Sequence, residues 1–387
     1  MSSATKVLLS FILGVIVGWA GFAAYGNNAA PLDEEGGEER ADIEASEPIT
    51  LGFIGPLTGD AASLGLASRA AVELAVEDVN QDGGVNGHRL EVIYEDGQCN
   101  PTAGTNAAAK LMNVDKVPLI IGGLCSSETS AFGPAAMQNK TVVLSYCSSA
   151  PSLSDLGKYF FRDYPSDLGQ GKVAAEYAFE KLKAQNVAVL FHDTAWGTGL
   201  RDVFKGRFEE LGGKIVSVDG APQDSRDYRT VLTKIKNSAP DVIYFAGYPE
   251  GSIAALKQAN ELGITTQFLG GDAWDDPKLH TEVSGKGSYR YVVPVANFPE
   301  DFKSRLLGKT GGEQVPICAP QAYDAVKVAT EVLKAVGTDP DKIEQAMRKV
   351  NYYGVSGQIA FDEKGDLTSG SYAIREVRGG SSVEVSE

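Results

Sequence analysis

The stretch NVAVLFHDTAWGTGLRDVFKGRFEELGGKIVSVDG, residues 186–220, shows the pattern that decides the fold class. NVAVLFHD is a nearly continuous apolar run typical of a buried strand, TGLRDVFKGRFEELG has helical spacing, and KIVSVDG is a second strand candidate. The same alternation runs back to ITLGFIGP at 49–56 and on to TQFLGG at 266–271. Alternating strands and helices predict parallel sheets with helices on both faces. Because the strands are too many for one open sheet, we predict an α/β fold of two doubly wound lobes.

Length and charge narrow the class of protein. The chain has 387 residues, more than a single domain usually contains, which agrees with two lobes. Its formal net charge of -16 argues against a nucleic-acid partner, whose phosphates would be repelled. Part of this charge lies between Pro31 and Pro48, where eight acidic residues accompany one Arg. We therefore predict a solvated acidic linker at residues 26–47.

The N-terminal 25 residues differ from the rest in composition. Lys6 is the only charge before VLLSFILGVIVGWAGFAAY, residues 7–25, which is long enough to span a bilayer core as a helix. Residues 1–25 are therefore either a membrane anchor or a signal peptide. The small residues at 21 and 23 favour cleavage, whereas the length of the run and the acidic linker favour an anchor. Both interpretations predict a periplasmic or extracellular protein.

Polar and aromatic residues follow several of the predicted strands. In doubly wound sheets ligands bind at the carboxyl ends of the strands, where loops and helix N-termini gather. We therefore predict a ligand-binding cleft between the lobes, lined from both halves of the chain by Ser126, Ser148, Ser149, Trp196, Tyr248 and Asp272. Asp275 and Asp276, in the same GDAWDD segment, are expected in solvent.

The motifs of common enzyme classes are absent from the sequence. The turn after the first strand reads GPLTGD rather than GxGxxG, and no GxSxG occurs. The serine loops have no nearby His to act as a base. The three His and four Cys have no zinc-ligand spacing. We predict a binding protein with no catalytic residue, no cofactor and no metal.

Several segments together resemble the leucine/isoleucine/valine-binding proteins among the type I periplasmic binding proteins. They are GPLTG at 55–59, NxxGGVNGHRLEV at 80–92, EDGQCNP at 95–101, GGLCSSET at 122–129, SxAPSL at 148–153 and FDEKGDL at 361–367. The resemblance extends over residues 49–376. It implies an extracytoplasmic protein that closes by a hinge around an amino acid, branched-chain or related, and delivers it to an ABC permease in the membrane. We expect a monomer. A ligand-sensing receptor with the same fold is the alternative.

The resemblance also implies three chain crossings between the lobes, near Pro165, Pro294 and Gly354. Lobe 1 would comprise residues 48–165 and 294–354, and lobe 2 would comprise residues 166–293 and 355–387.

The family's ligand contacts can be transferred to matching positions. Ser126 and Ser149, with the backbone around Cys147 and Ser148, would hold the ligand's α-carboxylate; their alternative role is ordinary helix capping. Asp272 would pair with the α-ammonium, where the family commonly has Glu, and its alternative is a solvated loop residue.

Trp196 and Tyr248 would cover the ligand from the second lobe, and core packing is their alternative. Leu64 stands where the family often has an aromatic residue. Together with Trp196 and Asp272, it argues against strict specificity for leucine.

The four cysteines fit an oxidising compartment. The resemblance implies a disulfide between Cys99 and Cys125, which follow the second and third predicted strands. The carboxyl ends of parallel strands share one edge, where two Cα atoms can come within about 4.4–6.8 Å. Two buried free thiols are the alternative. Cys147 and Cys318 are a second candidate pair.

Overall fold

The computed structural model describes residues 47–385. The predicted anchor or signal peptide at 1–25, and all but the last residue of the predicted linker at 26–47, lie outside the described residues. Within the described part of the chain, no helix has the length and apolar character needed to cross a membrane.

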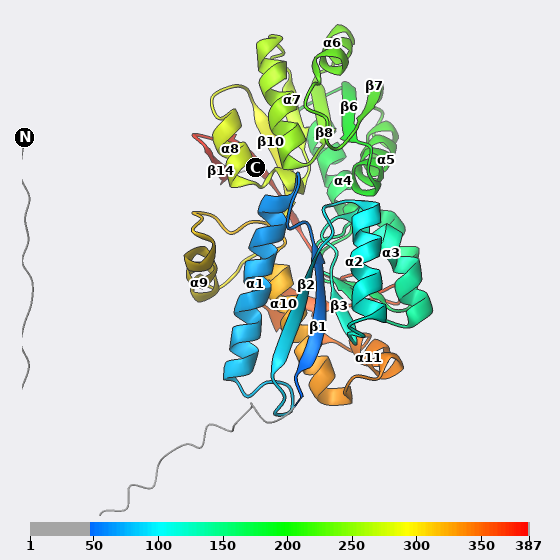
Figure 1. The fold of residues 1–387 in the computed structure, drawn as a ribbon. Helices are drawn as coiled ribbons and strands as arrows, with labels where there is room; N and C mark the ends of the chain where they lie inside the picture. Colours follow the sequence, from blue (N-terminus) through cyan, green and yellow to red (C-terminus); the bar gives the residue numbers. More distant parts are fainter. Residues whose placement is uncertain (1–46, 386–387) are drawn as a thin grey trace, which may run out of the picture. The chain divides into compact units, whose positions relative to one another are not determined.

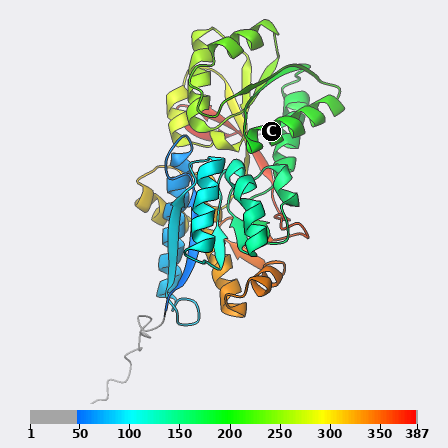
Figure 2. The same cartoon turned by 45° about the vertical axis from the view of Figure 1, so that its right-hand side comes forward.

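The first lobe is built on a sheet of five parallel strands (Figures 1 and 2). Their order is β2-β1-β3-β4-β5, with β1 (Ile49–Gly55), β2 (Leu90–Asp96), β3 (Leu119–Ile121), β4 (Val142–Ser145) and β5 (Phe160–Arg162). Helices on both sides complete the lobe: α1 (Ala62–Gln81), α2 (Pro101–Asn113), α3 (Ser126–Asn139), η2 (Pro151–Asp155), α9 (Glu300–Thr310), α10 (Ala319–Val336) and α11 (Pro340–Met347). α1 packs on α10, and α2 packs on α3.

The second lobe contains a mixed sheet of seven strands, ordered β14-β13-β10-β9-β8-β6-β7. The strands are β6 (Asn186–His192), β7 (Lys214–Ala221), β8 (Val242–Ala246), β9 (Gln267–Gly270), β10 (Tyr289–Pro294), β13 (Tyr372–Arg378) and β14 (Ser381–Glu384). Its helices are α4 (Asp167–Glu176), η3 (Tyr177–Lys181), α5 (Ala195–Glu210), α6 (Arg229–Asn237), α7 (Pro249–Glu261), η4 (Asp272–Trp274) and α8 (Pro277–Val283). β13 and β14 are antiparallel to their neighbours, so this sheet departs from the all-parallel expectation.

The two sheets repeat one strand order. The first five strands are arranged β2-β1-β3-β4-β5, and β7-β6-β8-β9-β10 follows the same scheme in the second lobe. In this order the chain reverses its winding direction between β1 and β3, and again between β6 and β8. The loops after these strands diverge from one another and leave room for a ligand at each switch point.

Local chemistry sets the helix starts beside these loops. The Asn100 side chain accepts from the Thr102 and Ala103 N–H groups at the start of α2, where Pro101 needs no backbone donor. The Thr194 side chain likewise accepts from Gly197 at the start of α5. Both helices therefore begin at defined points next to the carboxyl edges of their sheets.

The third crossing between the lobes lies later in the chain than we expected. Instead of leaving near Gly354, the chain forms a hairpin of β11 (Asn351–Gly354) and β12 (Gly357–Ala360). The carboxylate of Asp324 in α10 accepts from Val355 N–H at 2.9 Å. A further bridge pairs Phe361 with Leu367. These contacts keep the hairpin and the segment after it beside the first sheet, and the chain joins the second sheet only at β13.

All four cysteines are paired. Cys99 and Cys125 form one disulfide, with a Cα separation of 5.2 Å, and Cys147 and Cys318 form another, at 5.3 Å. The first joins the loops after β2 and β3. The second joins the loop after β4 to the start of α10. The loops at the carboxyl edge of the first sheet are thus covalently tied together.

Candidate ligand-binding site

Ser126 is the first residue of α3, at the switch point between β1 and β3, and is 1 % exposed. Its Oγ accepts the Ala150 N–H at 3.1 Å, which leaves the hydroxyl hydrogen to donate. The N-cap of α3 is Cys125, and the N-cap of η2 is Ala150. The capping alternative therefore describes neither Ser126 nor Ser149.

Ser149 faces the second lobe's first helix. Its hydroxyl donates to Asp167 Oδ2 at 2.9 Å, and its carbonyl accepts the Asp167 N–H. Ser148 has a different role, since its hydroxyl contacts Gly123 O and Thr129 Oγ1 at 2.9 and 2.8 Å. The Ser148 N–H donates to Ser145 Oγ at 3.0 Å, and its carbonyl accepts from Arg162 at 3.4 Å. The side chain and the backbone of Ser148 are therefore both used within the protein. Cys147, in the same loop, is buried and disulfide-bonded.

Asp272 is a buried carboxylate rather than a solvated loop residue. It follows β9 and is 4 % exposed. Oδ2 accepts the Tyr164 hydroxyl at 2.6 Å, and Oδ1 accepts the Ala273 N–H at 2.9 Å. Burial raises the pKa of Asp272, and these hydrogen bonds oppose the rise because they stabilise the charged form.

The prediction that Asp276 lies in solvent was wrong. It is 1 % exposed and accepts the Leu279 N–H at the start of α8, 2.9 Å away. Its other oxygen accepts the hydroxyl of Ser63, from α1 of the first lobe, at 2.8 Å.

Trp196 and Tyr248 meet at the second switch point, after β6 and β8. Their ring centroids are 4.9 Å apart and each residue is 4 % exposed. The Tyr248 N–H donates to His192 Nδ1 at 3.1 Å, so that nitrogen carries no proton. Burial lowers the pKa of His192 to about 3, which keeps the ring neutral. A Cβ on Gly271 would lie 3.2 Å from Trp196, so the indole reaches the Asp272 loop.

Leu64 lies in the first turn of α1, in the segment that follows β1. It is 2 % exposed, and its carbonyl accepts the Ser68 hydroxyl at 2.8 Å. Leu64 therefore contributes an aliphatic surface near the first switch point. The roles of these side chains toward a ligand remain predictions.

Sequence reasoning missed three polar residues that the structure brings to the same place. Tyr164 contacts Asp272, Asp167 contacts Ser149, and Gln170 Oε1 accepts the Asp272 N–H at 3.2 Å. The signal for Asp167 and Gln170 was the PSDLGQG segment at 165–171, where they lie three residues apart at a helix start, and Tyr164 directly precedes this segment.

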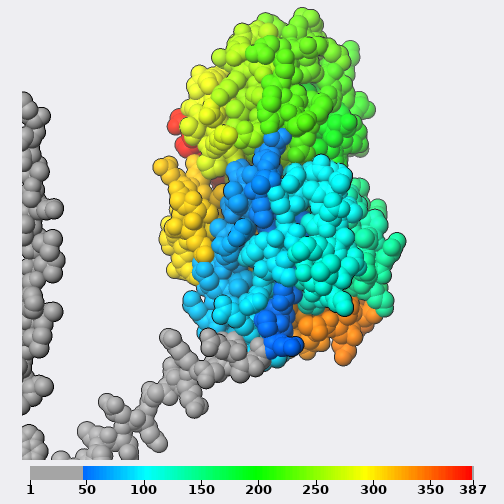
Figure 3. All heavy atoms as spheres, in the orientation of Figure 1, coloured from blue at the N-terminus to red at the C-terminus, as the bar shows by residue number. Residues whose placement is uncertain are grey.

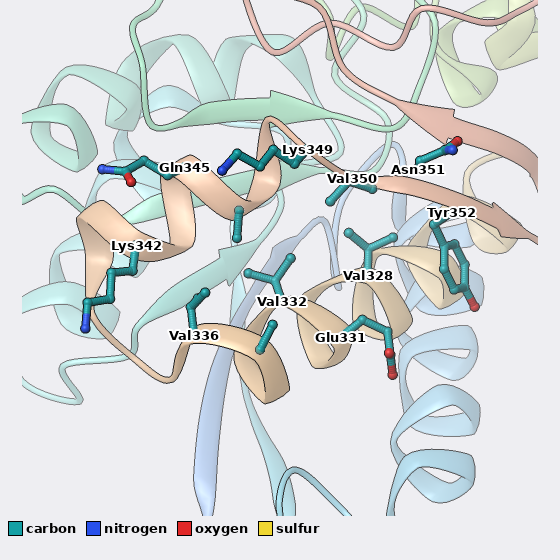
Figure 4. Close-up of a pocket in the computed structure, with 12 residues that line it drawn as sticks. Val328, Glu331, Val332, Val336, Lys342, Gln345, Lys349, Val350, Asn351 and Tyr352 are labelled. Carbon is teal, nitrogen blue, oxygen red and sulfur yellow. The ribbon is translucent and has the colours of Figure 1, made fainter.

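Two grooves elsewhere on the surface contain none of the predicted ligand contacts. One, of about 510 Å³, lies between α10 and α11 and is lined mainly by aliphatic side chains with Lys and Glu at its rim (Figure 4). The other, of about 580 Å³, is lined by Ser127 and η2 of the first lobe and by the start of α5 in the second. The buried polar groups between the two switch points are the stronger candidate site.

Two doubly wound lobes, with buried hydroxyls and carboxylates in the loops and helix starts near their switch points, define a two-lobed binding protein of the type I periplasmic class. The family model described as "Periplasmic binding protein" matches residues 48–381, and the chain belongs to this family. The family consists of substrate-binding proteins rather than enzymes, and it places the domain outside the cytoplasm.

Named relatives agree with this assignment. A leucine-, isoleucine-, valine-, threonine- and alanine-binding protein of Pseudomonas aeruginosa is 29% identical over 339 residues, covering 86% of this chain and 90% of the relative. The structure of a leucine-binding protein from Thermotoga maritima is 28% identical, with a TM-score of 0.81, covering 87% of this chain and 98% of the other. A solute-binding protein from R. palustris in complex with 4-hydroxybenzoate is 21% identical, with a TM-score of 0.78, covering 88% and 96%. That last likeness concerns the fold alone.

Proposed function

We propose that this protein binds a free α-amino acid between its lobes and serves as the solute-binding component of an ABC transporter. The observation that carries the proposal is the burial of Asp272, whose carboxylate accepts the hydroxyl of Tyr164 at the crossing between the lobes. A buried carboxylate needs a cation, and the ammonium of an amino acid supplies one. Ser126 and the N-terminus of α3 offer donors to the ligand's carboxylate.

The same carboxylate separates amino acids from aromatic acids, which relatives of this fold also bind. Benzoate-type ligands carry a carboxylate and no ammonium, so they would add a negative charge near Asp272 without neutralising it. Arg162, the cation that acts on this region, is already bonded to Asp366 at 2.8 Å. The charge balance therefore favours a zwitterion.

Hinge closure is supported by polar contacts between the lobes. Ser63 contacts Asp276, and Ser127 Oγ accepts the Ala195 N–H at 3.0 Å. In Figure 3 the start of α1 (blue) lies against the second lobe. A ligand held between the lobes would favour this arrangement, and a permease could distinguish it from an open one.

The proposal is tested by a thermal-shift screen against the twenty standard amino acids. A ligand at 100 times its Kd stabilises the folded protein by about 2.7 kcal/mol. Calorimetry should then show binding of the free amino acid and none of its N-acetyl or amide derivative. Asp272→Ala should lower affinity by about 2–5 kcal/mol, which is at least about thirtyfold. Equal affinity for the N-acetyl derivative would exclude this binding mode.

A further inference from the structure

We infer that Asp167 is a second ligand-binding carboxylate, and that Asp167 and Asp272 together bind one ammonium group in exchange for one proton. This inference rests on the proposed function and extends it. It identifies a residue of α4 that the sequence did not suggest, and it makes ligand binding dependent on pH.

Asp167 has a buried carboxyl oxygen without a hydrogen-bond partner. It is fully buried at the start of α4, and Oδ2 accepts the Ser149 hydroxyl at 2.9 Å. Oδ1 is also buried and has no hydrogen-bond partner. Such an atom is costly to bury, since it has lost its water and gained nothing in return. A ligand N–H group would restore the missing bond.

Gln170 connects this carboxylate to the second one. It lies three residues after Asp167 on α4, and its Oε1 accepts the Asp272 N–H at 3.2 Å. Its Nε2 is buried without a partner. Gln170 thus follows Asp167 by one helical turn and bonds the backbone of Asp272, while Ser149 of the first lobe bonds the Asp167 carboxyl and Tyr164 bonds the Asp272 carboxyl. An ammonium has three N–H donors and can contact both carboxyl groups.

The charges around the pair decide its proton content. Arg162 of β5 is the cation that acts on Asp167, and it is committed to Asp366, to Ser154 and to the carbonyl of Ala150. The other titratable groups that interact electrostatically with the pair are four tyrosines. They are Tyr164 of the crossing segment, Tyr244 of β8, Tyr248 at the start of α7 and Tyr372 of β13. These hydroxyl groups bring no positive charge.

Without a ligand, the pair thus holds one proton and one negative charge, since the charge on one buried carboxylate opposes ionisation of the other. Asp272 accepts two hydrogen bonds that favour its ionised form, so the proton resides on Asp167. Burial raises the pKa of Asp167 well above its usual range, and the charge of Asp272 raises it further. When the ammonium enters, the Asp167 O–H bond breaks and its proton passes to solvent. Two carboxylates then share one cation and keep a net charge of minus one.

The test is calorimetry on the full chain, with the standard amino acid that stabilises it most in the thermal screen. Titrations at pH 7 in phosphate and in Tris, which have different ionisation enthalpies, report the number of protons released. We expect about one proton released per ligand, and an affinity that rises up to tenfold per pH unit below the pKa of the pair.

Asp167→Asn should bind at least tenfold more weakly and release no proton. The matched control is Asp163→Asn. Asp163 is another buried acid whose pKa is raised by burial, but it lies beside Asp324, so its variant should still release the proton. The trimethylammonium derivative of the same amino acid has the charge without N–H donors and should bind poorly.

The outcomes separate the two proposals. If none of the twenty amino acids binds, the proposed function fails. If one binds to the wild-type protein without proton release, the present inference is wrong while the proposed function stands, whether or not the Asn variant folds. If a folded Asp167→Asn variant keeps the wild-type affinity and proton release, the inference about Asp167 is also wrong.

Discussion

The guanidinium of Arg226, in the loop between β7 and α6, bonds the carboxylate of Asp60, in the loop between β1 and α1. The two residues belong to opposite lobes. Arg226 is about half exposed, whereas Asp60 is mostly buried. The Arg226–Asp60 ion pair therefore joins the two lobes, as the Ser63–Asp276 hydrogen bond does.

Arg226→Gln should weaken ligand binding because it destabilises the arrangement in which the lobes are in contact. A partly exposed ion pair contributes about 0.5–1 kcal/mol, so we expect a two- to fivefold rise in Kd by calorimetry. Arg229→Gln is the matched control, since Arg229 pairs with Asp227 and Glu261 inside the second lobe. Equal effects of the two substitutions would show that closure does not depend on the Arg226–Asp60 pair.

The two disulfides should differ in their effect on stability. Cys99 and Cys125 are separated by 26 residues, and Cys147 and Cys318 by 171. On the chain-entropy model, losing these cross-links costs about 3–4 and about 5 kcal/mol. Urea unfolding of the two paired Cys→Ser variants measures this. We also expect the first variant to lose ligand affinity, because Ser126 follows Cys125 directly. Free alkylation of Cys99 and Cys125 in the exported protein would contradict the pairing.

The N-terminal segment makes a separate prediction. If residues 7–25 are retained, the expressed protein should fractionate with membranes and resist carbonate extraction, because about 20 apolar residues span the bilayer core. A cleaved signal peptide would instead yield soluble exported protein beginning near Ala24, which intact mass spectrometry detects. Deleting residues 1–25 is the control, since it should remove membrane association without changing the melting temperature of the domain.

Much of the fold, and part of the candidate site, could be predicted from the sequence for physical reasons. Strand and helix periodicity identified most of the parallel strands, though not β5 and β10, and the rule that ligands meet strand ends led to the candidate residues Ser126, Trp196, Tyr248 and Asp272. β13 and β14 were missed because their residues are only partly buried and lack a continuous apolar run.

Asp167 was missed for another reason. An acidic residue at a helix start has an ordinary role there, favourable interaction with the helix dipole. Only the fold shows that this carboxylate is buried, that it contacts Ser149 and that it lies near a second acid. The late third crossing depends on Asp324, whose contacts with the Val355 and Ser356 backbone span about 30 residues of sequence.

Glu128 is a buried acid that contacts the backbone of both cysteines of the first disulfide. It is fully buried in the first turn of α3, and its two oxygens accept the Cys99 N–H at 2.7 Å and the Cys125 N–H at 3.2 Å. Burial raises the pKa of Glu128 to about 7, although these hydrogen bonds oppose the rise. The folded protein therefore holds a proton at pH values where the unfolded chain has released it.

Stability should consequently fall as pH rises from about 4.5 to about 7. Over that window the folded state binds more protons at Glu128 than the unfolded state, so the free energy of unfolding decreases, by about 3 kcal/mol in total. The Glu128→Gln variant cannot titrate at this position, so its free energy of unfolding should not show this part of the decrease with pH. It loses the hydrogen bond to one N–H, so it should be less stable than the wild type at pH 4.5. Urea unfolding of both proteins at several pH values gives the two curves. Parallel curves between pH 4.5 and 7 would mean that Glu128 is ionised throughout and that its N–H contacts outweigh its burial.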